Sequence, residues 1–161
     1  IAQCLVGSEM CIRDREIIVL DFEEKALCRK AAGILELSVK KGYDHYSFSR
    51  LWLKSKTANN LYHWNSNDIA QSKQYLLHSV ELEYHLDNEY QKTYDFYFAD
   101  AMYWFGYITM YFSLSFAKSP LEIYEEYDIE KIIESYDTLH TLSSKVAVDK
   151  IKNDFAFVVN L

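Results

Sequence analysis

The feature that most constrains the fold is the stretch from Asp100 to Lys118, DAMYWFGYITMYFSLSFAK. Between these two charged residues lie seventeen uncharged ones, most of them aromatic or large and apolar. Burying one large apolar side chain contributes about 1.5–3 kcal/mol, so this segment alone can anchor a hydrophobic core. We predict a central, nearly enclosed helix over about 100–117, around which the other elements pack.

Small residues in this stretch favour a helix over a pair of strands. They recur at spacings of three and four, which places them on one helical face. These residues are Gly106, Thr109, Ser113 and Ala117. We expect a neighbouring helix to approach closely on this face, while Trp104 and Tyr107 project elsewhere. A membrane span is disfavoured, because tyrosines run through the middle of the segment and no basic cluster flanks one end.

Capping signals predict further helices along the chain. Asp21 and Glu24 have the spacing of a capping box, and Gly42 is suited to end that helix after about Lys41. Ser119 and Pro120 form the clearest start signal in the chain. Other predicted starts lie at Ser47, at Asn67 or Asp68, at Asp128, and at Ser143 or Ser144. Loops are predicted over 57–67 and 87–97. The fold class is therefore all-α, a single-domain multi-helix bundle over 16–161.

The order of these signals is similar in the two halves of the chain. Each half has a long helix, a break, a short aromatic helix, a corner and a final helix. The offset between equivalent positions is 75 residues from Ala26 to Ala101. A duplicated helical hairpin is one explanation of this order. The apolar segments 16–21 and 156–161 either pair as short strands or simply pack.

Composition bounds the environment and the partners. The formal net charge is −7, which argues against a nucleic-acid-binding surface and suits a basic partner. The three cysteines do not suggest a disulfide framework, and we expect a reducing cytoplasm and no membrane. Cys28 occupies an apolar helical position, whereas Cys4 and Cys11 lie in the first fifteen residues.

The first fifteen residues differ from the rest. The run CLVGSEMCIRDR resembles translated sequencing-adapter read-through, and it has no helical or strand periodicity. We therefore expect residues 1–15 to be a non-native tail.

A weak metal-site pattern and a weak pocket pattern stand out. His78, Glu81 and His85 are spaced three and four apart, but a solvated polar helix face explains them better than a metal, and we predict no cofactor. Tyr62, His63 and Trp64 form an aromatic group suited to stacking on a base. His140 follows Asp137 in a turn, but no glycine-rich turn supplies an oxyanion hole, so we predict no catalytic residue.

An acidic, tyrosine-containing run is the predicted partner-binding surface. It consists of Glu122, Tyr124, Glu125, Glu126, Tyr127 and Asp128. Tyrosine is favoured at interfaces because it combines a large contact area with a polar tip. The carboxylates suit a basic toxin-like partner, and a merely solvated helix face is the simpler alternative.

Motifs in the second half resemble a bacterial family. These are Ala101-Met102-Tyr103-Trp104, Gly106-Tyr107, Glu122-Ile123-Tyr124 and Leu139-His140-Thr141-Leu142. They resemble small helical proteins of Firmicutes and related bacteria, many of them uncharacterised, that tend to be encoded in mobile or toxin–antitoxin-type neighbourhoods. The chain has Met110-Tyr111-Phe112-Ser113 where those proteins carry Arg-Tyr-Trp-His. The resemblance implies a helical fold and a role beside a partner protein.

Two functional hypotheses follow. The first is a non-enzymatic accessory protein that binds another protein, with the antitoxin-like member of a toxin–antitoxin-type pair as its specific form. The alternative is a small enzyme or nucleotide-binding domain that uses His63, Trp64 and His140. A single pocket joining these three residues would favour the alternative.

Overall fold

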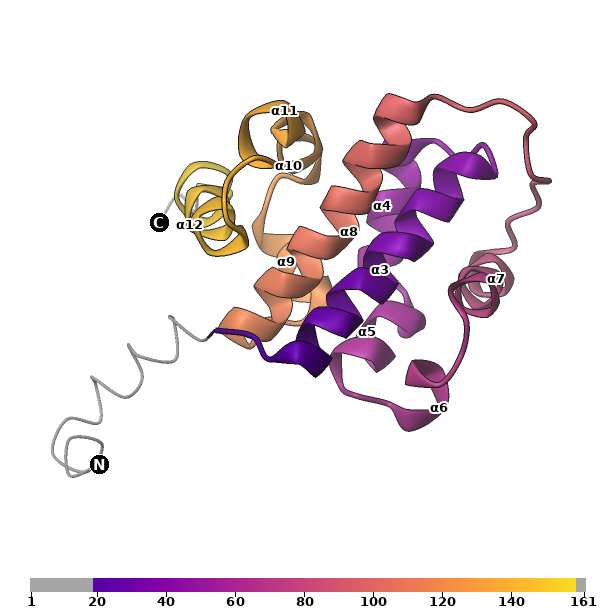
Figure 1. Cartoon of the computed structure of the whole chain (residues 1–161), viewed down its shortest axis with the longest axis horizontal. Helices are drawn as coiled ribbons and strands as arrows, with labels where there is room; N and C mark the ends of the chain where they lie inside the picture. The colour runs from indigo at the N-terminus through magenta and orange to yellow at the C-terminus, as the bar shows by residue number, and fades with distance from the viewer. Residues whose placement is uncertain (1–18, 159–161) are drawn as a thin grey trace, which may run out of the picture.

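Two long helices lie side by side at the centre of the molecule. They are α3 (Phe22–Lys40) and α8 (Phe96–Phe116), and they run antiparallel in the computed structural model, which describes residues 19–158 (Figure 1). The others are α4 (His45–Lys54), α5 (Lys56–Tyr62), α6 (Ser66–Ile69), α7 (Lys73–Tyr84), α9 (Pro120–Glu126), α10 (Ile129–Glu134), α11 (Tyr136–Leu139) and α12 (Ser144–Asp154). The fold is a single all-α domain around an aromatic helix, as predicted.

The contact between α3 and α8 is as close as the small residues predicted. A Cβ atom added to Gly106 would lie 2.8 Å from the carbonyl oxygen of Ala31, a distance that real Cβ atoms do not reach. Thr109 and Ser113 are buried on the same side of α8. Ala117 is an exception to the prediction: it is exposed and ends the helix with a φ of +51°.

The helix order repeats in the two halves. From α3 to α7 the lengths are 19, 10, 7, 4 and 12 residues. From α8 to α12 they are 21, 7, 6, 4 and 11 residues. Each half thus has a long helix, two short ones, a single turn and a final helix of about three turns. This order agrees with the order expected from the sequence, and a duplicated unit stays a prediction.

Local capping accounts for the starts that were predicted correctly. Asp21 and Glu24 form a reciprocal capping box at the start of α3, and Gly42 follows its end with a φ of +92°. Ser119 caps α9 with Pro120 in its first turn. Asp128 caps α10 and Ser143 caps α12.

Other predicted boundaries are wrong, because a different polar side chain caps the helix. Asp44 rather than Ser47 caps α4, and Ser72 rather than Asn67 or Asp68 caps α7. The predicted loop over 57–67 contains most of α5 and the start of α6, which Ser55 and Asn65 cap. Asp95 caps α8, whose first residue, Phe96, lies four residues before the predicted start, so the linker occupies 85–95 instead of 87–97.

Of the two alternatives for the closing segment, its described part, 156–158, packs against the α9–α10 junction rather than pairing with the described end of 16–21. Ala156 forms an isolated antiparallel bridge with Tyr127, which holds the end of the chain against α9 and α10. The predicted non-native tail over 1–15 and the last residues, 159–161, lie outside the described residues. None of the helices formed within residues 19–158 is long and apolar enough to cross a membrane.

Candidate functional site

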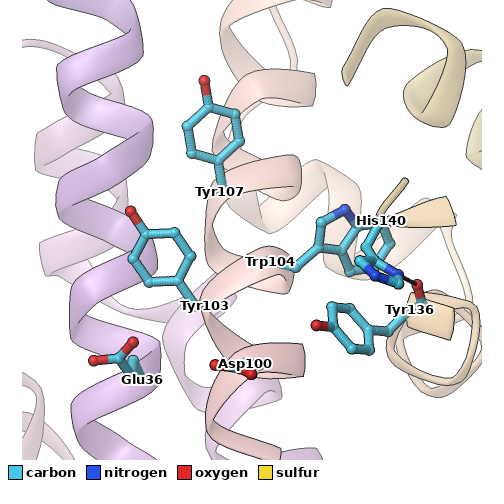
Figure 2. A pocket seen from close by; sticks show the side chains of 7 residues that line it. All are labelled: Glu36, Asp100, Tyr103, Trp104, Tyr107, Tyr136 and His140. Atoms are coloured by element: carbon cyan, nitrogen blue, oxygen red, sulfur yellow. Dashed lines mark hydrogen bonds between the residues drawn. The ribbon is translucent and has the colours of Figure 1, made fainter. Parts of the chain in front are cut away.

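A surface hollow of about 360 Å³ lies between the two central helices and the single-turn helix α11. We call it the aromatic–acidic pocket. It is lined by Glu36, Asp100, Tyr103, Trp104, Tyr107, Tyr136 and His140. Four of these side chains come from α8, one from α3, one from α11 and one from the residue that ends α11 (Figure 2).

The α8 residues reach the pocket because of their helical spacing. Asp100, Tyr103, Trp104 and Tyr107 are three and four residues apart, so they share one face, well away from the face of Gly106. In Figure 2, Tyr103 and Tyr107 lie toward α3 and Trp104 points toward α11. The same helix therefore supplies a packed small-residue face and a half-exposed aromatic face.

The two carboxylates of the pocket differ in their partners. The Glu36 carboxylate lies 3.0 Å from Lys40 Nζ, one turn further along α3. Asp100 is exposed, and no other residue in 19–158 forms a hydrogen bond or an ion pair with its carboxylate. Burial, followed by the nearby charges of Asp100 and Asp137, raises the pKa of Tyr136. The Asp100 carboxylate is thus the unpaired negative charge of the pocket, and it attracts cations and repels phosphate groups.

His140 forms part of the pocket wall through two contacts with Tyr136. Its ring stacks on that of Tyr136 with centroids 4.3 Å apart, and Trp104 lies 5.9 Å from Tyr136. His140 Nδ1 is 2.6 Å from the backbone carbonyl oxygen of Tyr136. A carbonyl oxygen only accepts, so Nδ1 carries the proton and Nε2 of the neutral ring is an acceptor.

The residues predicted to form a joint nucleotide pocket lie in separate places. Tyr62 and His63 are at the end of α5, where their rings contact each other with centroids 4.9 Å apart. Trp64 lines a second hollow, which we call the Lys30 pocket. It is lined by Phe22, Glu23, Ala26, Leu27, Lys30, Trp64 and Ile69. His140 lines the aromatic–acidic pocket instead, so the structure does not bring it together with Trp64.

The predicted acidic surface is only partly available to a partner. Glu122 and Glu125 are exposed, whereas Tyr127 is buried, and its ring centroid lies 5.0 Å from that of Phe112. The other members have partners within the chain. Glu126 pairs with Lys118 at 2.6 Å, the ring of Tyr124 lies 4.9 Å from Lys54 Nζ, and the Asp128 side chain caps α10. Tyr127 is therefore wrong as a partner-binding residue, because it belongs to the core.

The three residues with metal-ligand spacing do not converge. Glu81 accepts hydrogen bonds from Lys41 Nζ at 2.7 Å and from the Tyr43 hydroxyl, and it lies 3.7 Å from His78 Nδ1. His85 ends α7 with a φ of +56°, so its backbone has left the helix. Within the described part of the chain, no group of three histidine, cysteine, aspartate or glutamate residues is arranged to hold a metal ion.

Sequence reasoning found only His140 among the pocket residues. The spacing of Asp100, Trp104 and Tyr107 was a usable signal, because it marks a second, charged face on the aromatic helix. Glu36 and Tyr136 gave no local signal, since only the packing of α3 and α11 against α8 brings them there.

No protein-family model, curated protein or solved structure matches this chain. The geometry of the pocket is therefore the basis for inferring a function.

Proposed function

We propose that this chain is a non-enzymatic accessory protein that binds another protein, and that basic side chains of the partner enter the aromatic–acidic pocket. One observation carries the proposal. The Asp100 carboxylate, unpaired among the described residues, lies beside the half-buried rings of Trp104 and Tyr136. A cation over an aromatic face gains about 0.5–2 kcal/mol, and a nearby carboxylate adds a charge-assisted hydrogen bond.

Several features support a protein partner. The pocket is an open surface hollow rather than an enclosed cavity, so a side chain projecting from another surface can reach it. Tyrosine and tryptophan, which line it, are enriched at the centres of protein interfaces. Glu122 and Glu125 are exposed at α9, and such charges increase the rate of association with a basic protein. A basic toxin-like protein is a partner of this chemistry, which agrees with the antitoxin-like form of the proposal.

The nucleotide-binding alternative has less support. The unpaired Asp100 carboxylate in the hollow repels phosphate groups, and His140 lies apart from Trp64. The only described cysteine, Cys28, is buried, and burial raises its pKa to about 12, which keeps the thiol protonated and unreactive at neutral pH.

A peptide-binding experiment tests the proposal. A fluorescein-labelled Gly-Ser peptide that carries both lysine and arginine is titrated with the protein, and binding is followed by fluorescence polarisation. A peptide with glutamine at the basic positions is the reference. We expect the basic peptide to bind, and Asp100→Asn to weaken binding about tenfold or more, which corresponds to the loss of one charge-assisted hydrogen bond.

Asp149→Asn is the matched control, because it makes the same change at an exposed position on α12, outside both the pocket and the predicted acidic surface. We expect it to change the affinity by less than about twofold at 0.15 M salt, where distant charges are screened. Equal losses in the two variants would assign binding to general electrostatics rather than to the pocket. Equal binding of the basic and glutamine peptides would overturn the proposal.

A further inference from the structure

We infer that the aromatic–acidic pocket selects arginine over lysine, so that the partner protein presents a guanidinium group to it. This inference rests on the proposed function and specifies the side chain that binds. It depends on three observations: the half-buried rings that line the pocket, the set of acceptors around them, and the way in which the same fold holds an ammonium group elsewhere.

The ring faces favour a planar cation. Trp104, Tyr136 and His140 form one aromatic wall, with Tyr136 and His140 stacked at 25° to each other. Tyr103 and Tyr107 line the opposite side of the pocket, toward α3 (Figure 2). A guanidinium stacks flat on such a face while its N–H groups donate in its own plane. A lysine ammonium is compact and strongly hydrated, and an open hollow removes little of its water.

The polar atoms of the pocket suit a cation with several donors. Asp100 and Glu36 offer carboxylate oxygens, and His140 offers Nε2 because Nδ1 donates to the Tyr136 carbonyl. These acceptors are spread over three helical elements rather than gathered at one point. A guanidinium has five N–H donors in a fixed fork, whereas an ammonium has three donors at one nitrogen. The two oxygens of the unpaired Asp100 carboxylate can therefore accept two parallel N–H bonds from a guanidinium, a geometry that an ammonium does not offer.

The Lys30 pocket shows how this fold holds an ammonium group. Lys30 Nζ donates to the backbone carbonyl oxygens of Ile69 and Gln71, the latter at 2.7 Å. These two carbonyl oxygens lie close together at the end of α6, and both accept hydrogen bonds from the compact ammonium group of Lys30. The aromatic–acidic pocket differs in that no lysine or arginine lines it, and its Asp100 carboxylate has no partner among residues 19–158. The Lys30 pocket thus already contains its cation, whereas the aromatic–acidic pocket leaves a place for one from a partner.

The test compares peptides that differ at one residue. Gly-Ser peptides with a single arginine, lysine, trimethyl-lysine or citrulline at the centre are titrated by fluorescence polarisation. We expect the arginine peptide to bind roughly tenfold more tightly than the lysine peptide, because only the guanidinium both stacks and forms a forked hydrogen bond. Citrulline keeps the shape without the charge, and we expect it to bind no better than the Gly-Ser background.

Two pocket variants and one control locate the preference. Trp104→Leu removes a stacking face and Asp100→Asn removes a charged acceptor, so we expect each to reduce the arginine-to-lysine ratio to about twofold or less. Trp64→Leu alters the exposed tryptophan of the Lys30 pocket and should leave the ratio unchanged. The melting temperature of each variant shows whether it is folded. If Trp104→Leu does not fold, Asp100→Asn alone provides the test of the pocket.

The outcomes separate this inference from the proposed function. Equal affinities for arginine and lysine peptides would overturn the selectivity and leave the proposed function standing. Tighter binding of trimethyl-lysine would also overturn it, since that group donates no hydrogen bond. No binding of any cationic peptide would overturn both. A preference that survives Trp104→Leu and Asp100→Asn would contradict the assignment to this pocket.

A final arm distinguishes arginine in a protein from a small guanidine. Agmatine is used to displace the arginine peptide. We expect it to bind more weakly than the peptide, because peptide backbone and neighbouring residues contact the pocket rim. Agmatine that binds as tightly as the peptide would overturn the assignment of a protein partner.

Discussion

The Lys30 pocket and the aromatic–acidic pocket occupy corresponding places in the two halves of the molecule. The first lies between the long helix α3 and the single-turn helix α6, and the second between α8 and α11, with α3 alongside. In the first, the central charge belongs to Lys30, and backbone carbonyls of the same half satisfy it. In the second, the central charge belongs to Asp100, which is paired with nothing in residues 19–158.

The contrast between the paired Lys30 and the unpaired Asp100 separates charges that stabilise the fold from charges that are available to a ligand. A charged group that is satisfied within the chain contributes to the fold and is not available to a ligand. A charged group that is left exposed beside aromatic rings contributes little to the fold and is available. Functional sites tend to be places where local interactions are left incomplete. The contrast between Lys30 and Asp100 is therefore open to direct test by substitution.

The largest effect is expected where the two halves meet. Gly106→Leu places a side chain where even a Cβ atom would lie 2.8 Å from Ala31 backbone. The two long helices must separate, and we expect a loss of about 3 kcal/mol or more in the free energy of unfolding, measured by urea denaturation. Both pockets depend on α3 or α8, so the separation should disturb both.

Gly33→Ala is the matched control on α3. A Cβ atom there would lie 3.0 Å from Cδ of Lys73, which belongs to a flexible side chain. We expect little change or a gain of up to about 1 kcal/mol, because alanine is the better helix former. If Gly106→Leu were as stable as the parent, the close contact between the halves would be incorrect.

The second-largest loss in the free energy of unfolding is expected at Glu81, which links α7 to the end of α3. Glu81 is buried and accepts hydrogen bonds from Lys41 and Tyr43. Burial raises its pKa, but these hydrogen bonds and the charge of Lys41 outweigh burial, so the net shift is downward. Glu81→Gln leaves Lys41 without its counter-charge, and we expect a loss of about 2–3 kcal/mol at pH 7.

The pH dependence of this loss has a defined sign. Because the pKa of Glu81 is depressed in the folded protein, its contribution is fully present above the unfolded value of 4.5. The contribution disappears as the pH falls through the lower pKa of the folded state. Urea denaturation of both proteins between pH 7 and the acid range should show the gap narrowing. A gap that stays constant would mean that the carboxylate charge is not involved.

The parts of the fold that could be predicted are those with local causes. The capping box at Asp21 and the Ser119-Pro120 start depend on residues a few positions apart, and both are confirmed. The helices α5 and α6 were missed because Asn, Ser and Thr favour turns as much as caps. Ser55 and Asn65 cap these helices, and tertiary packing of Leu61 decides between the two outcomes for α5.

The candidate site was less predictable than the fold. Asp100 and Trp104 share a helical face that the sequence displays. Glu36 is more than sixty residues away in sequence from Asp100, and it reaches the pocket only because α3 and α8 run antiparallel. The paired state of Lys30 likewise depends on where α6 ends. The periodicity of the sequence does not indicate which charged side chains form ion pairs or hydrogen bonds in the folded chain.

The third-largest loss in the free energy of unfolding is expected at Lys30, whose charge is paired within the chain. Lys30→Met keeps most of the side-chain volume but removes the donor to the Ile69 and Gln71 carbonyls. Since these carbonyls are only partly buried and can bind water, we expect a loss of about 1–2 kcal/mol in unfolding free energy. Lys145→Met is the control, because Lys145 is exposed on α12 and should change stability by less than about 0.5 kcal/mol. Equal losses in the two variants would mean that the paired charge of Lys30 does not stabilise the fold more than an exposed lysine does.

The smallest effect is expected at Asp100. Its carboxylate accepts no hydrogen bond from residues 19–158, and it lies beyond the first turn of α8, so neither a cap nor the helix dipole depends on it. Asp100→Asn removes an exposed negative charge from a chain of net charge −7 and should leave the unfolding free energy within about 0.5 kcal/mol of the parent, on the stabilising side. The same urea denaturation used for Lys30→Met measures it. A loss as large as that of Lys30→Met would show that Asp100 is a structural charge, and the two pockets would then be alike. A stable Asp100→Asn protein that binds basic peptides poorly would instead mean that this carboxylate serves the ligand rather than the fold.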